Sequence, residues 1–313
     1  MIRLQSRLTG YDLRMFSGLH QLVRKTPWLG RTILKAIPDV KWNINVEPIG
    51  RMAIRLRQHR LFWLRPHLQD DRYMFGALQR LVHKGDVVYD LGANIGLYSR
   101  FFVQCCGAAQ VYAFEPMANN RQLLAENIAI GGCSSQATVL PYAVGNVDGT
   151  LEFQVDDLTS NSGTLDVVTG GRASQSRAQY GLPPRTVFVH GVRLDTLVQT
   201  GQIPVPNVIK LDIEGAEALA LEGAQELLSR QISRIALELH GSDATKNVLK
   251  LLWQHGYHCF GRLLKDGVRK HTRVVEEDLH VITGRYSLYQ LFASPDPGEL
   301  IAPIQEYPQG TQV

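Results

Sequence analysis

The chain has 313 residues, of which 44% are hydrophobic and 20% are charged, with four cysteines and a formal net charge of +4. This length and composition suit one large globular domain with additions, or two modest domains. The sequence shows no apolar leader segment and no stretch of 18 apolar residues, so it predicts neither a signal peptide nor a membrane span.

The first part of the chain is strongly basic. Residues 1–67 hold thirteen Lys and Arg against three acidic residues, a net charge of +10 that leaves −6 for the remainder. Clustered cations attract phosphate, an anionic membrane surface or an acidic polymer, although a solvated basic face explains them equally well. The cysteines have no metal-ligand spacing and suit a reducing compartment. We expect a cytoplasmic protein and leave open peripheral membrane contact through the basic segment.

The predicted elements begin with short pieces. Residues 13–37 mix apolar and basic residues at rough helical spacing, interrupted by Pro27 and Gly30, which favours two short helices. Residues 42–57 alternate with a period of two around a turn with proline and glycine, which predicts a hairpin. Residues 70–83 begin with two aspartates and repeat apolar residues at three- and four-residue steps, a pattern typical of a helix.

Beyond Gly85 apolar strands alternate with segments of helix length, which predicts a parallel sheet with right-handed crossovers. The expected strands are residues 86–92, 110–116, 137–145, 207–213, 234–240, 257–261 and 286–293. The expected helices are residues 96–106, 118–130, 216–228 and 245–256. The rhythm breaks in the middle, where two strands, 150–155 and 185–194, flank a polar loop over residues 156–184. Loops of this length are typically lids or disordered segments.

The first strand, loop and helix, VVYDLGANIGLYS, have the order of a nucleotide-binding turn. Gly92 and Gly96 would let the backbone approach a ligand, and the next helix offers free N–H groups. The pattern departs from G-x-G-x-x-G, so a dinucleotide fits poorly. Asp90 would repel phosphate and attract an amine or a sulfonium, and S-adenosylmethionine is such a ligand. Asp90 could instead cap the helix.

Glu115 ends the next strand, 25 positions after Asp90. Acidic residues that bind ribose hydroxyls in such folds lie at an offset of about 20 residues. The alternative for Glu115 is an exposed charge in a turn. Both acids at consecutive strand ends favour one shared ligand.

Four motifs together resemble the FkbM family of S-adenosylmethionine-dependent methyltransferases. They are GDVVYDLGANIGLYS at 85–99, FEP at 114–116, AVGN at 143–146 and IKLDIEGAE at 209–217. The resemblance implies an α/β, Rossmann-like fold with a seven-stranded, mostly parallel sheet, a last antiparallel strand and helices on both faces. It also implies methylation of hydroxyl groups on sugars, glycans or natural products. The cofactor-binding residues that it implies are Asp90, Gly92, Ala93, Asn94, Gly96, Glu115, Pro116 and Ala143.

The resemblance covers about residues 70–293 and divides the chain. We expect a basic N-terminal extension over residues 1–69, the methyltransferase domain over 70–293 with a strand and loop insertion over 149–204, and a surface tail over 294–313. The resemblance leaves the methyl acceptor open.

The strand 207–213 ends in charged residues. Lys210, Asp212 and Glu214 fall on one side of an extended chain, at the sheet edge where open α/β folds bind ligands. Asp212 is the predicted base or acceptor-orienting residue, with Lys210 stabilising charge nearby. Glu214 either joins this chemistry or caps the next helix. Glu217 is expected to be a solvated residue of the first helical turn, favoured by the helix dipole.

The strand 234–240 should lie beside this one, with Glu238 and His240 on a shared side. His240 is the histidine expected to act, because imidazole titrates near neutral pH, and a structural role is the equal alternative. Asp212, Glu214, Glu238 and His240 could also hold a divalent cation, since carboxylate oxygens suit Mg²⁺. Their spacing is not diagnostic, so the metal requirement stays open.

Two other functions compete with methylation of a hydroxyl. A non-catalytic adaptor would keep the fold and dock on a membrane or an anionic polymer through the basic extension. A nucleic-acid methyltransferase would carry a [DNS]-P-P-[YFW] turn at the fourth strand to hold a flipped base. The chain has LDIEG there, so no nucleic-acid partner is expected. The oligomeric state is left open.

Overall fold

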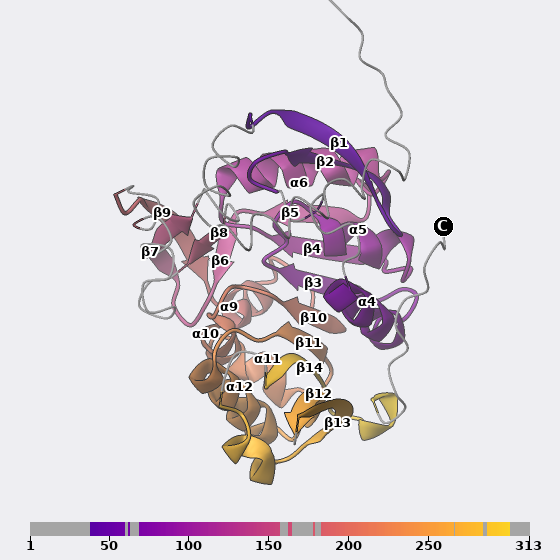
Figure 1. The fold of residues 1–313 in the computed structure, drawn as a ribbon, viewed down its shortest axis with the longest axis vertical. Helices are drawn as coiled ribbons and strands as arrows, with labels where there is room; N and C mark the ends of the chain where they lie inside the picture. Colours follow the sequence, from indigo (N-terminus) through magenta and orange to yellow (C-terminus); the bar gives the residue numbers. More distant parts are fainter. Residues whose placement is uncertain are drawn as a thin grey trace, which may run out of the picture.

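A computed structural model describes residues 38–59, 62, 69–156, 162–164, 178, 183–265, 267–283 and 287–300 (Figure 1). The two helices predicted over residues 13–37 lie outside the described residues, as does most of the loop at 156–184. No helix in the described ranges is both long and apolar enough to cross a membrane.

The centre of the molecule is an eight-stranded sheet in the order β13-β12-β14-β11-β10-β3-β4-β5. Its strands are β3 (Val87–Leu91), β4 (Gln110–Phe114), β5 (Ala137–Leu140), β10 (Val208–Leu211), β11 (Arg234–Glu238), β12 (His258–Lys265), β13 (Val268–Val274) and β14 (Leu288–Ser294). The five strands from β5 to β11 pair in parallel. β14 inserts antiparallel between β11 and β12, so the predicted antiparallel last strand is present.

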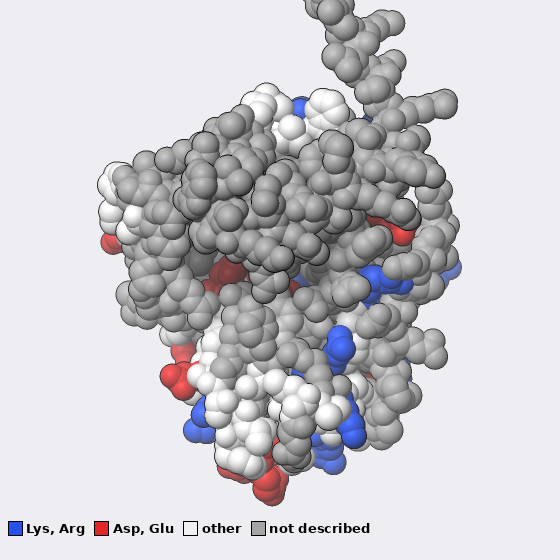
Figure 2. Space-filling model, viewed as in Figure 1, with Lys and Arg blue, Asp and Glu red and all other residues white. Residues whose placement is uncertain are grey.

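The eighth strand was missed from the sequence. β13 forms a hairpin with β12 and has the sequence VRKHTRV, which is too charged to show the apolar pattern of a strand. An edge strand needs one neighbour only, and charged side chains on it prevent pairing with other chains. Figure 2 shows Lys and Arg side chains over this hairpin, at the lower part of the view.

Helices cover both faces of the sheet because buried residues alternate along its strands. One face packs under α4 (Gln69–Leu81), α5 (Leu97–Gln104) and α6 (Ala118–Ile130). The other packs against α9 (Leu194–Gln199), α10 (Glu217–Glu222), α11 (Gln225–Ser229) and α12 (Ser242–Gln254). In β10, Val208 belongs to the first core, while Ile209 and Leu211 belong to the second. Lys210 therefore points toward α5.

Two predicted elements are divided in the structure. The helix expected over 216–228 breaks into α10 and α11 at Gly223, where a Cβ atom would lie 2.0 Å from the backbone oxygen of Gly145. The strand expected over 137–145 breaks at Pro141 into β5 and β6 (Tyr142–Val144). β6 leaves the central sheet for a second one.

This second sheet has the order β6-β9-β7-β8 and projects from the side of the molecule (Figure 1). It contains β7 (Gly149–Asp156), β8 (Ser162–Thr164) and β9 (Thr186–Val192). β7 and β9 correspond to the two predicted strands that flank the polar loop, and they pair antiparallel. The sheet therefore comes mainly from the region that interrupts the alternation of strands and helices.

The predicted hairpin is present as β1 (Lys41–Val46) and β2 (Gly50–Arg55), an outer layer along the top of Figure 1. The buried Asn127 side chain of α6 fastens it to the domain. Its Oδ1 accepts from the Ala53 N–H at 2.7 Å, and its Nδ2 donates to the oxygens of Ala53 and Ile95 at 3.0 and 2.8 Å. The same amide thus holds both the hairpin and the loop before α5.

The domain boundaries at 69, 293 and 294 stay predictions. Ser294 is the last residue of β14, and Leu300 is buried against the core that includes α4. The Glu299 carboxylate lies 3.7 Å from the Arg234 guanidinium, so residues just beyond 293 pack on the domain.

Candidate functional site

A cavity opens at the carboxyl ends of β3, β4 and β10, with β6 and β7 of the second sheet along one wall. Seven of the predicted site residues line it: Gly92, Asn94, Glu115, Pro116, Ala143, Asp212 and Glu214. Parallel strands bring loops from distant parts of the chain to one sheet edge, which is why these residues meet. Six of the predicted site residues are not in its lining: Asp90, Ala93, Gly96, Lys210, Glu238 and His240.

Gly92 joins the two sides of the cavity. It has φ +77°, and a Cβ atom there would lie 2.0 Å from the backbone oxygen of Asp212. No side chain fits so close to a carbonyl oxygen, so the loop after β3 can touch the end of β10 only through a glycine. Asn94 follows with φ 50°, in the left-handed region that asparagine tolerates.

Glu115 is buried and held by backbone donors. Its Oε2 accepts from the Asn94 N–H at 3.0 Å and its Oε1 from the Met117 N–H at 2.8 Å. Burial raises the pKa of Glu115 to about 7, and these hydrogen bonds limit the rise. Glu115 is therefore not an exposed turn charge. The buried Oδ1 of Asn94 beside it has no hydrogen-bond partner among the described residues.

Asp90 lies beneath α5 and away from the cavity lining. It is fully buried, its Oδ2 accepts from the Ser99 hydroxyl at 2.6 Å, and its Oδ1 lies 3.5 Å from Lys210 Nζ. Burial raises the pKa of this carboxyl, while Lys210 and Ser99 oppose the rise. Ala93 and Gly96 also pack inward, Ala93 in a small core cluster and Gly96 as the N-cap of α5.

Lys210 bridges the ends of β3 and β10. Its Nζ lies 3.5 Å from Asp90 Oδ1, 3.5 Å from Asp212 Oδ2 and 4.5 Å from the centre of the Tyr98 ring. Burial by itself would lower the pKa of Lys210, but the Asp212, Asp90 and Glu238 carboxylates raise it above its usual value. The buried ammonium is thus charged and reaches the cavity lining at Asp212.

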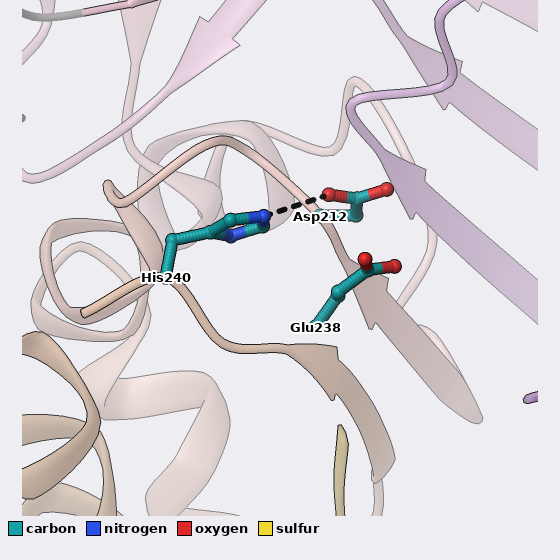
Figure 3. A group of neighbouring side chains, drawn as sticks. All are labelled: Asp212, Glu238 and His240. Atoms are coloured by element: carbon teal, nitrogen blue, oxygen red, sulfur yellow. Dashed lines mark ion pairs between the residues drawn. The ribbon is translucent and has the colours of Figure 1, made fainter. Parts of the chain in front are cut away.

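Asp212 is partly open to solvent, with 27% of its side chain exposed, and it lines the cavity. Lys210 approaches its Oδ2, and Nε2 of His240 lies 3.9 Å from its Oδ1 (Figure 3). Two cationic side chains therefore flank one carboxylate. Such an arrangement fixes where the carboxylate points while leaving it accessible.

His240 is buried at the end of β11. Its Nδ1 lies 2.8 Å from Glu217 Oε1, and its Nε2 lies 3.8 Å from Glu214 Oε2. Burial alone would lower the pKa of His240, but Glu217, followed by Asp212 and Glu214, raises it to about 9. At neutral pH the ring is therefore an imidazolium that donates, which is the opposite of a base.

The prediction that Glu217 is solvated is wrong. The side chain is fully buried, and its Oε1 also accepts from the Gly215 N–H at 3.1 Å. The partner histidine lies 23 residues away in sequence, so no local pattern indicated the pair. Pairing explains the burial, since an isolated buried carboxylate is costly.

The candidate metal ligands come together in part. Ligand atoms of Asp212, Glu238 and His240 all lie within 4.8 Å of one another (Figure 3). Carboxylate oxygens and an imidazole nitrogen suit several divalent cations. Because His240 carries its proton at neutral pH, a cation would have to displace that proton.

The chain is similar in sequence to known methyltransferases. The family model described as the methyltransferase FkbM domain matches residues 90–259. Hexuronic acid methyltransferase AglP of Haloferax volcanii is 29% identical over 192 residues, which cover 61% of this chain and 71% of AglP. The 31-O-demethyl-FK506 methyltransferase FkbM of Streptomyces tacrolimicus is 28% identical over 189 residues, covering 55% of this chain and 73% of that enzyme.

A crystal structure of methyltransferase FkbM from Methylobacillus flagellatus is also similar, with 19% identity and a TM-score of 0.41. The match covers 66% of this chain and 43% of the other, and so low a score carries no conclusion. The family match, in contrast, spans more than half of the chain and runs from the end of β3 into β12, across both sides of the cavity. The chain belongs to the FkbM family of S-adenosylmethionine-dependent methyltransferases.

Proposed function

We propose that the protein transfers a methyl group from S-adenosylmethionine to a hydroxyl group of a sugar, glycan or natural-product acceptor. The observation that carries the proposal is the Asp212 carboxylate, which lines the same cavity as Gly92 and Glu115. The names of two relatives support this acceptor class, since one is a hexuronic acid methyltransferase and the other acts on 31-O-demethyl-FK506.

The cavity has groups that fit the cofactor. Ribose hydroxyls donate hydrogen bonds, and Glu115 offers a buried carboxylate at the cavity wall. An ammonium group also donates, and Asn94 Oδ1 is a buried acceptor without a hydrogen-bond partner in the described part of the chain. Pro116 and Ala143 also line the cavity. Asp90, Ala93 and Gly96 do not line it, and we assign them to holding the loop between β3 and α5 in place.

When bound, S-adenosylmethionine supplies an electrophilic methyl group on a sulfonium. We assign Asp212 the task of orienting the acceptor hydroxyl and receiving its proton as the C–O bond forms and the S–C bond breaks. Lys210 lies beside Oδ2 of Asp212, and His240 lies beside Oδ1, so each carboxylate oxygen has its own cationic neighbour. Glu214, the other acid in the cavity lining, is assigned to contact the acceptor.

A divalent cation is a second route to the same reaction, favoured by the grouping of Asp212, Glu238 and His240 with Glu214 close by. A cation there would bind the acceptor hydroxyl and lower its pKa. Turnover measured after removal of metal with EDTA, and again after addition of Mg²⁺ or Mn²⁺, decides between the routes. Unchanged turnover in EDTA removes the metal from the mechanism.

Calorimetric titration with S-adenosylmethionine and its demethylated product tests the cofactor, and it also separates an enzyme from a non-catalytic adaptor. A folded protein that binds neither would overturn the proposal. A screen of sugars, glycans and lipid-linked saccharides for transfer of a labelled methyl group then tests the acceptor.

The role of Asp212 has its own test. We expect Asp212→Ala to lose at least about a hundredfold in kcat while cofactor affinity stays within about threefold, because the side chain acts on the acceptor. Asp243→Ala, which removes an exposed acid of α12, is the matched control. Equal turnover in the two variants would take Asp212 out of the chemistry.

A further inference from the structure

A fully buried carboxylate, that of Glu217, lies next in sequence to Ala216 of the cavity lining. Glu217 is the first residue of α10 and belongs to the same LDIEGAE segment as Asp212. Its Oε1 accepts from the Gly215 N–H at 3.1 Å and pairs with His240 Nδ1 at 2.8 Å. The carboxylate thus links the loop after β10 to the end of β11.

The pairing determines which way the imidazole faces. With Nδ1 occupied by Glu217, the other nitrogen, Nε2, lies 3.9 Å from Asp212 Oδ1 and 3.8 Å from Glu214 Oε2. In metal-binding and catalytic histidines, the hydrogen bond at one ring nitrogen sets the orientation and protonation of the other. The chain of contacts therefore runs from buried Glu217 through His240 to two acids of the cavity lining.

The surroundings of His240 are mainly acidic. Glu217 faces it from α10, Asp212 and Glu214 from the loop after β10, and Glu238 from its own strand. The Tyr289 ring of β14 stands edge-on, with ring centres 6.4 Å apart. Lys210 lies on the far side of Asp212. Among these groups, Glu217 makes the shortest contact with the imidazole.

We propose that Glu217 is a positioning residue for methyl transfer, which holds His240 through Nδ1 so that Nε2 faces Asp212 and Glu214. The proposal rests on the proposed function and adds a residue to it. Without Glu217 the His240 ring would lose the hydrogen bond that fixes its orientation, and Asp212 would keep Lys210 at Oδ2 but lose a fixed imidazole at Oδ1. The acceptor hydroxyl would then meet a carboxylate with more freedom to turn.

The variant that tests this is Glu217→Met, which keeps the length of the side chain and removes the hydrogen-bond acceptor. We expect the NMR signal of His240 Nδ1, which reports the hydrogen bond at that nitrogen, to shift away from its position in the native protein. We expect kcat to fall about 10- to 100-fold with cofactor affinity within about threefold. Glu217→Asp, which retains the charge on a shorter stem, should recover part of both effects.

Asp243→Asn is the matched control, because Asp243 is also an acid in a first helical turn but is exposed. It should change neither the Nδ1 signal of His240 nor kcat. An unchanged Nδ1 signal or an unchanged kcat in Glu217→Met overturns the proposal. The NMR measurement needs neither cofactor nor acceptor, so a protein that fails to bind S-adenosylmethionine would end the proposed function and still show whether Glu217 holds His240.

Discussion

The two sides of the cavity hold their carboxylates by different means. Glu115, on the side of β3 and β4, accepts from the backbone N–H groups of Asn94 and Met117. Asp212, on the side of β10 and β11, is flanked by the side chains of Lys210 and His240. Backbone donors cannot titrate or rotate away, whereas cationic side chains can. One side is therefore held largely by backbone donors, to which the Asn120 side chain adds a hydrogen bond, and the other by charged side chains.

The largest effect should come from breaking the contact between the two sides. We expect Gly92→Ala to abolish measurable binding of S-adenosylmethionine, because its Cβ would lie 2.0 Å from the Asp212 oxygen and both backbones must move. Calorimetry measures the binding, and circular dichroism monitors the fold.

Gly132→Ala is the control for this substitution. Gly132 has a similar φ of +68° but nothing within 4 Å of a Cβ, so it carries the backbone strain of about 1–2 kcal/mol without the collision. If both variants bind the cofactor as the native protein does, the contact between Gly92 and the Asp212 backbone does not determine the cofactor site.

Removing the bridging cation should be the next largest effect. Lys210→Met leaves the buried Asp90 carboxylate without the ammonium that lies 3.5 Å away, and the loss of one partner of a buried pair costs about 3–5 kcal/mol. Urea unfolding measures this loss. The double variant Asp90→Asn, Lys210→Met should recover much of it, and equal stability of the single and double variants would show that the pair does not couple β3 to β10.

Through His240, the side of the cavity at β10 and β11 should make the free energy of unfolding depend on pH. The pKa of His240 is about 9 in the folded protein and about 6.5 when unfolded, so its contribution is complete below pH 6.5 and is lost as the pH rises through 9. This difference corresponds to at most about 3 kcal/mol. Urea unfolding at pH 6.5 and 9.5 should show the decline in the native protein and in His280→Ala, an exposed control, but not in His240→Ala.

The cofactor side should respond to pH through Glu115, with the smallest effect. Ribose hydroxyls donate best to an ionised carboxylate, and the pKa of Glu115 is raised to about 7 by burial. Affinity for S-adenosylmethionine should therefore fall about tenfold from pH 8 to pH 6. Glu115→Gln should bind more weakly and lose this dependence. A native affinity that is flat across this range would exclude Glu115 as the ionised ribose partner.

Much of the fold was predictable because its signals are local. Alternating strands and helices predicted the parallel sheet, and a two-residue period predicted the hairpin β1–β2. Breaks inside predicted elements were not predictable, since the break at Gly223 lies where the distant Gly145 backbone packs against the chain. β13 was missed because a charged edge strand takes its conformation from its neighbour.

For the site, residue types and strand ends were sufficient to predict that Gly92, Asn94, Glu115, Asp212 and Glu214 would share one cavity, because all parallel strands open at the same edge of a sheet. Lys210 and His240 were expected near Asp212, but the buried partners Asp90 and Glu217 were beyond the reach of local pattern. Lys210 meets Asp90 because β10 pairs with β3, and Glu217 meets His240 because the start of α10 lies beside the end of β11. Strand order and burial set these contacts, and neither is encoded in the spacing of the residues along the chain.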